Sequence, residues 1–133
     1  MSRRNHRRVS PPPRSPRGLA RRVRRILTPN HRIALKRTAL RDCLKRCVYC
    51  AEELALEAAT LDHVHPVSRG GGDDVGNLVV ACAACNRMKG DMLPAEFFAR
   101  YPWAGLNFMR YARTVHRALK RGARRAVSLA YAA

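Results

Sequence analysis

The alternation of hydrophobic and polar positions predicts short elements in the first two thirds of the chain. Thr28-Pro29 is a favourable helix start. Ile33, Arg37, Leu40 and Leu44 then follow at spacings of four, three and four, so a helix with a narrow apolar stripe is expected over about 29–45. Residues 59–64 and 78–81 are expected to form two partner strands, joined by a glycine-rich loop and followed by a short helix from about residue 84. Unbroken apolar runs are only a few residues long, far below the roughly 20 residues that cross a bilayer, which excludes an integral membrane protein.

Two more helices are expected near the C-terminus. Residues 94–98 favour a short helix because Pro94 suits a first helical turn. A longer amphipathic helix is expected over about 107–121, with Gly122 interrupting it. The apolar face of this helix would comprise Phe108, Tyr111, Ala112, Val115, Ala118 and Leu119.

The N-terminal segment, residues 1–28, is rich in arginine and contains Pro11-Pro12-Pro13, a composition typical of a disordered arm. An arm that grips phosphates is the favoured interpretation. A solvated tail or an organelle presequence stays open, whereas a secretory signal is disfavoured because no apolar stretch follows the arginines. The basic faces of the 29–45 helix fit either a DNA backbone or plain solvent.

The chain is strongly basic. The chain has 133 residues and a formal net charge of +18, which fits one domain with tails and a polyanionic partner, nucleic acid first. The charge is +15 over residues 1–46, −4 over 47–93 and +7 over 94–133. An acidic centre between basic flanks indicates a metal-dependent active site, because carboxylates hold hard cations. We therefore expect a basic arm (1–28), a basic helix (29–46), a core (47–93) and a helical extension (94–133).

Four of the five cysteines form two CxxC pairs, Cys47/Cys50 and Cys82/Cys85. Two such turns can complete a tetrahedral zinc site, and four protein ligands leave no open position, so the ion would be structural. Disulfides suit a secreted chain, and a redox motif explains one pair but not two. Cys43 lies on the expected first helix and is interpreted as a small buried hydrophobe.

The segment between and after the two pairs resembles a known family. Its motif residues are Asp62-His63, Pro66, Gly70-Gly71, Asn77-Leu78, Cys82-x-x-Cys85-Asn86 and Lys89-Gly90. Together they resemble the HNH nucleases, in the branch whose ββα-metal fold is braced by a four-cysteine zinc. The resemblance covers residues 47–92 and implies an α+β fold with a small ββα-metal core and a Zn(Cys)4 site, flanked by basic helices.

The chemistry of three residues fits the roles that the resemblance implies. Asp62 and Asn86 correspond to the family's catalytic metal ligands, and an Asp/Asn pair favours Mg²⁺ or Mn²⁺ over Zn²⁺. His63 would be the general base that activates water. In a regular strand Asp62 and His63 point to opposite sides, so a bulge or the metal must bring both to one phosphate. Asn77 would tether the loop and orient the histidine.

Other polar residues of the segment have weaker assignments. Arg69, Arg87 and Lys89 are expected to contact flanking phosphates. His65 could be a third metal ligand, a phosphate contact or a polar residue with no special role. Asp73 and Asp74 follow three glycines and are interpreted as turn residues rather than ligands.

These features predict a metal-dependent HNH endonuclease that cuts DNA with low sequence specificity and leaves 5′-phosphate and 3′-hydroxyl ends. The alternatives are a non-catalytic zinc protein that binds nucleic acid, and an HNH nuclease that acts on RNA or structured DNA. DNA is the expected partner, no membrane is involved, and the cytoplasm or nucleoid is the expected location. Target sequence, oligomeric state and biological role stay open.

Overall fold

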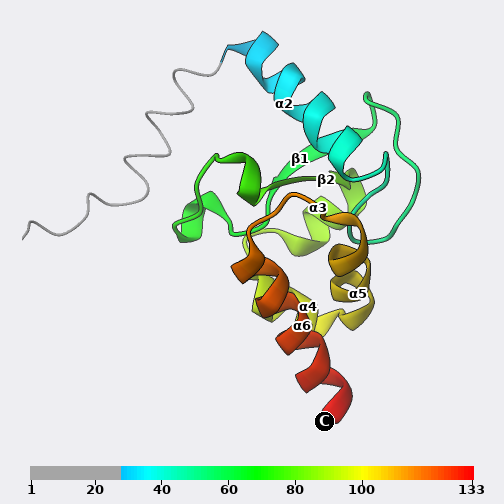
Figure 1. The fold of residues 1–133 in the computed structure, drawn as a ribbon, viewed down its shortest axis with the longest axis vertical. Coiled ribbons are helices and arrows are strands. Elements are labelled where there is room, and N and C mark those ends of the chain that lie inside the picture. Colours follow the sequence, from blue (N-terminus) through cyan, green and yellow to red (C-terminus); the bar gives the residue numbers. More distant parts are fainter. Residues whose placement is uncertain (1–27) are drawn as a thin grey trace, which may run out of the picture.

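The computed structural model describes residues 28–133, so the predicted basic arm lies outside the described residues apart from Thr28. None of the helices in this part combines the length and apolar character needed to cross a membrane. In Figure 1, α2 lies at one end and α4, α5 and α6 gather at the other, with the sheet between them. The elements in chain order are α2 (Pro29–Asp42), β1 (Ala59–His63), two 3-10 turns (Val67–Arg69 and Val75–Asn77), β2 (Leu78–Cys82), α3 (Ala83–Lys89), α4 (Pro94–Arg100), α5 (Pro102–Tyr111) and α6 (Arg117–Ala132).

The centre of the fold is an antiparallel hairpin followed by a helix. β1 pairs with β2 from Ala59 opposite Cys82 to His63 opposite Leu78 without interruption. Every residue of β2 from 78 to 81 is buried, because α2 covers the sheet and α3 contacts both strands. This ββα arrangement confirms the α+β fold expected from the sequence.

Helix α2 begins as predicted but ends three residues early. The Thr28 side chain caps its first turn by accepting from the backbone N–H of His31. Leu44 and Lys45 have φ values of 58° and 56°, in the left-handed region that terminates a helix. Only part of the predicted apolar stripe packs against the core, since Leu40 is buried whereas Ile33 is 46% exposed.

The prediction of one helix over 107–121 is wrong. α5 ends at Tyr111, and α6 begins at Arg117 and runs through Gly122. Between them the backbone N–H of His116 donates to the carbonyl of Gly76 at 2.9 Å, so the chain turns toward the loop before β2. The apolar period continues across the break because both helices pack into the same core.

A cluster of four aromatic rings joins the C-terminal helices to the rest of the chain. We call Tyr49, Phe97, Phe98 and Phe108 the aromatic cluster; all four are fully buried. Tyr49 meets Phe97 edge-on, with ring centroids 5.1 Å apart, and stacks on Phe108 at 6.3 Å. Such pairs contribute about 0.5–1.5 kcal/mol each beyond area burial. The C-terminal helices thus pack directly on a residue of the first CxxC turn.

Candidate active site and metal centre

The two CxxC pairs come together in space. The sulfur atoms of Cys47, Cys50, Cys82 and Cys85 all lie within 4.8 Å of one another. The Cys50 and Cys82 sulfurs are 3.9 Å apart, close to the separation of about 3.8 Å that a tetrahedral ion with bonds of about 2.3 Å requires. The four cysteines are therefore positioned to bind one metal ion, whereas Cys43 is buried in the core and stays outside the cluster.

The environment of the sulfurs fits a site that is completed by a cation. Burial raises the pKa of Cys50 to about 11 and also raises the pKa of Cys85. Burial would raise the pKa of Cys82 too, but the backbone N–H and thiol of Cys85 hydrogen-bond to its sulfur and lower it. Metal binding needs thiolates, so an ion entering this site displaces protons and offsets the charge repulsion among the sulfurs.

Three of the four residues expected to form the catalytic site, all except Asn77, line one hollow of about 240 Å³ beside the end of β1. Asp62 and His63 reach it from the strand and Asn86 reaches it from α3. The strand ladder contains no bulge at these positions. Both neighbours nevertheless line the hollow, because His63 is the last residue of the strand.

Asp62 is buried and held by two partners. The hydroxyl of Tyr49 donates to one carboxylate oxygen, and the ammonium of Lys89 lies 3.4 Å from the other. Burial raises the pKa of Asp62 above its ordinary value, although the positive charge of Lys89 opposes the shift. A carboxylate has about four acceptor positions, so these two bonds leave capacity for a cation.

The placement of Lys89 corrects the expectation that it contacts a phosphate. Its side chain is fully buried, and its ammonium also donates to the carbonyl of His63 at 2.9 Å. Lys89 therefore ties α3 to the end of β1 and neutralises Asp62 from inside the protein.

The amide of Asn86 is oriented by a short chain of hydrogen bonds. Its nitrogen donates to the hydroxyl oxygen of Thr60 at 3.1 Å, and that hydroxyl donates to the carbonyl of Ala81 at 2.8 Å. With the nitrogen engaged in this way, the amide oxygen is the atom left to bind a ligand. Asp62 and Asn86 thus offer oxygen donors, the set that suits Mg²⁺ or Mn²⁺.

Asn77 fastens the loop between the strands. Its amide oxygen accepts from the backbone N–H of His65 at 2.8 Å, and its nitrogen donates to the carbonyls of His65 and Gly72. The His65 ring in turn bonds to the carbonyl of Arg69 at 2.8 Å. His65 therefore supports the loop, and none of the three Asn77 bonds reaches the His63 ring.

Sequence reasoning missed two acidic residues and one phenol of the site. Asp73 was expected to be a turn residue, yet its side chain is only 7% exposed and one oxygen pairs with the His63 ring. Asp91 is exposed and lines the same hollow. Tyr49, between two cysteines, gave no sign of its bond to Asp62. A single sequence carries no signal for the two pairs, because their partners lie 10 and 13 positions apart.

Two basic residues lie on the surface around the site. Arg69 is half-exposed and pairs with Glu96 at 3.1 Å, while Arg87 is exposed in the last turn of α3. Their contact with phosphates stays a prediction.

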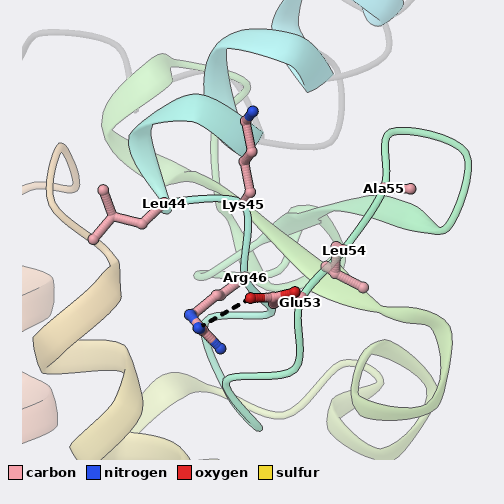
Figure 2. A pocket seen from close by; sticks show the side chains of 6 residues that line it. All are labelled: Leu44, Lys45, Arg46, Glu53, Leu54 and Ala55. Atoms are coloured by element: carbon pink, nitrogen blue, oxygen red, sulfur yellow. Dashed lines mark hydrogen bonds and ion pairs between the residues drawn. The ribbon is translucent and has the colours of Figure 1, made fainter.

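A second hollow, of about 380 Å³, opens between the end of α2 and the strand-like segment after the first CxxC turn. Figure 2 shows Arg46 and Glu53 pointing toward one another there, and they pair at 3.3 Å. The one acidic residue that lines it is thus already paired with Arg46, so we assign it no function.

Comparison with known proteins identifies the domain. The family model described as HNH endonuclease matches residues 47–92. Residues 47–92 are an HNH domain. The four-sulfur cluster, the hairpin and α3 all lie within its limits, whereas α2 and α4 to α6 lie outside them.

The fold of the chain is also found among solved structures. The chain is similar to the type II-C Cas9 enzyme from Actinomyces naeslundii, with a TM-score of 0.53 and 22% sequence identity over 73% of this chain. The matched part is only 11% of that enzyme, and at this identity the similarity concerns the fold alone. No curated protein shows a significant match.

Proposed function

We propose that this chain is a metal-dependent endonuclease that hydrolyses phosphodiester bonds of DNA. The observation that carries the proposal is that His63, Asp62 and Asn86 line a single hollow within the HNH domain. A base and two oxygen ligands beside one another are the parts that phosphodiester hydrolysis requires.

In this proposal each residue has one task. His63 accepts a proton from the attacking water, and Asn77 keeps the loop beside it in place. Asp62 and Asn86 hold a divalent cation, Mg²⁺ or Mn²⁺. Such a cation supplies charge neutralisation at the scissile phosphate and stabilisation of the departing 3′ oxygen.

The four-cysteine cluster is proposed to hold zinc as a structural ion. The separation of its sulfurs suits that ion, and a small domain of this size buries too little apolar area to be stable unaided. The zinc would thus fix α3, which carries Asn86, and β2, which pairs with the strand that carries Asp62 and His63.

DNA is proposed as the substrate because the exposed surface of the C-terminal helix is basic. Arg117, Arg121 and Arg124 recur at spacings of four and three on α6 and are exposed, so they form one face. Contacts of this kind bind phosphates without reading sequence. Low sequence specificity is therefore proposed as well, and one reproducible cut site in a long DNA would contradict it.

A plasmid-nicking assay tests the proposal. With Mg²⁺ or Mn²⁺ the wild type should nick the plasmid, and His63→Ala should lose about 100-fold or more of the rate while still binding DNA. His31→Ala, the same change at an exposed position of α2, is the control and should retain activity. If wild type and His63→Ala bind DNA but neither cuts it, the chain is a binding protein. If the protein cleaves RNA in preference to DNA when both are present, the proposed substrate changes from DNA to RNA.

A further inference from the structure

The side chain that faces the His63 ring is Asp73. The Nε2 atom of His63 pairs with one carboxylate oxygen of Asp73. The histidine sits at the end of β1 and the aspartate in the loop ten residues later, so only the fold brings them together.

The loop fixes the two residues that precede Asp73. Gly71 packs so tightly that a Cβ there would lie 1.7 Å from the carbonyl oxygen of His65. The Asn77 amide fixes the carbonyl of Gly72 at 2.8 Å. The Asp73 side chain is 7% exposed, and its second oxygen is buried with no hydrogen-bond partner among the described residues. A buried carboxylate with a single partner is costly to keep, so its one bond must matter.

The chemistry of the pair defines the state of the histidine. An ionised carboxylate only accepts hydrogen bonds, so Nε2 of His63 must carry the hydrogen. In a neutral imidazole the lone pair then lies on Nδ1. We propose that Asp73 is a positioning residue that holds the Nε2–H tautomer of His63 and leaves Nδ1 as the atom that accepts the proton from water. This inference rests on the proposed role of His63 as the base.

Asn77 and Asp73 have different roles in the loop under this proposal. All three bonds of Asn77 go to backbone atoms, so Asn77 shapes the loop. Asp73 is the side chain that touches the ring itself. The orienting task assigned to Asn77 from the sequence is thus proposed to belong to Asp73.

The matched variants Asp73→Asn and Asp74→Asn test this inference in the full-length chain. The side-chain amide introduced by Asp73→Asn can donate to Nε2 and so favour the wrong tautomer, and kcat for nicking should fall about 10- to 100-fold with KM within about twofold of wild type. Asp74 is exposed and pairs with His116 instead, so Asp74→Asn should cleave at the wild-type rate. An unchanged kcat in Asp73→Asn would overturn the inference.

Nitrogen-15 NMR of the imidazole rings gives a second readout that does not depend on cleavage. Wild-type His63 should show hydrogen on Nε2, and Asp73→Asn should lose that preference. The His65 ring, bonded to Arg69, should be unchanged and reports that the loop is intact. Hydrogen on Nδ1 of wild-type His63 would refute the pairing. Absence of cleavage by the wild type, with the Nε2 tautomer present, would count against the nuclease proposal alone.

Discussion

Replacing Lys89 by methionine should destabilise the HNH domain rather than weaken its grip on DNA. The Lys89 side chain is fully buried, and its ammonium pairs with the buried carboxylate of Asp62. Methionine fills the volume but leaves that carboxylate with the Tyr49 hydroxyl as its hydrogen-bond partner. Breaking one side of a buried ion pair costs about 3–5 kcal/mol. We expect a loss of that size in the free energy of unfolding.

Urea unfolding of the zinc-saturated protein, followed by circular dichroism, measures this loss. Arg87→Met is the matched control, because Arg87 is exposed on the same helix and its loss should change stability by less than about 0.5 kcal/mol. In the double variant Asp62→Asn/Lys89→Met the buried charge is gone, so part of the loss, about 1–3 kcal/mol, should be recovered.

DNA binding at several salt concentrations separates the two possible roles of Lys89. Removing a residue that contacts a phosphate reduces the slope of log affinity against log salt by about 1. We expect that change for Arg87→Met and not for Lys89→Met. A stability loss below about 1 kcal/mol together with a reduced slope for Lys89→Met would refute the buried pairing.

Three further predictions concern the frame around the site. Cys85→Ala should give an unfolded protein by circular dichroism, since structural zinc contributes about 10–16 kcal/mol in small domains; a folded, zinc-replete variant would contradict the four-cysteine site. Asn77→Ala removes three hydrogen bonds, and chemical denaturation should show a loss of about 3 kcal/mol; a loss below about 1 kcal/mol would mean that the loop holds without them. Gly105→Ala places a Cβ 2.4 Å from Val127 and should lower stability by about 1–3 kcal/mol, whereas Gly122→Ala, with open space around it, should raise stability by up to about 1 kcal/mol; equal effects in thermal melts would contradict the packing of α5 on α6.

The sequence predicted the parts of the fold that depend on short-range chemistry. Two CxxC turns that share one ion must lie side by side, and this brought β2 and α3 beside the first turn at Cys47. Alternation and the glycine-rich loop located both strands to within a residue at each end. The motif placed Asp62, His63 and Asn86 in one segment, and the fold brings all three to one hollow.

What the sequence left undetermined depends on contacts between distant segments. The helical segment is interrupted after Tyr111, where the chain turns and the backbone of His116 bonds to Gly76. The spacing of hydrophobic residues carries no information on such a contact. The pairing of Asp73 with His63 depends on the path of a loop, and glycines alone suggested only a turn. Lysine is a residue type usually found on the surface, and only the structure shows that Lys89 is buried and pairs with Asp62.

The aromatic cluster limits how this HNH domain can be moved between proteins. A segment cut at residues 47 and 92 would carry all four sulfurs and the whole hollow beside Asp62 and His63, yet it would leave behind Phe97, Phe98 and Phe108. The ring of Tyr49, whose hydroxyl bonds to Asp62, would then lose its contacts with these three rings. Grafts and fusions should therefore include the chain at least through Phe108, because the transferable unit is longer than its family signature.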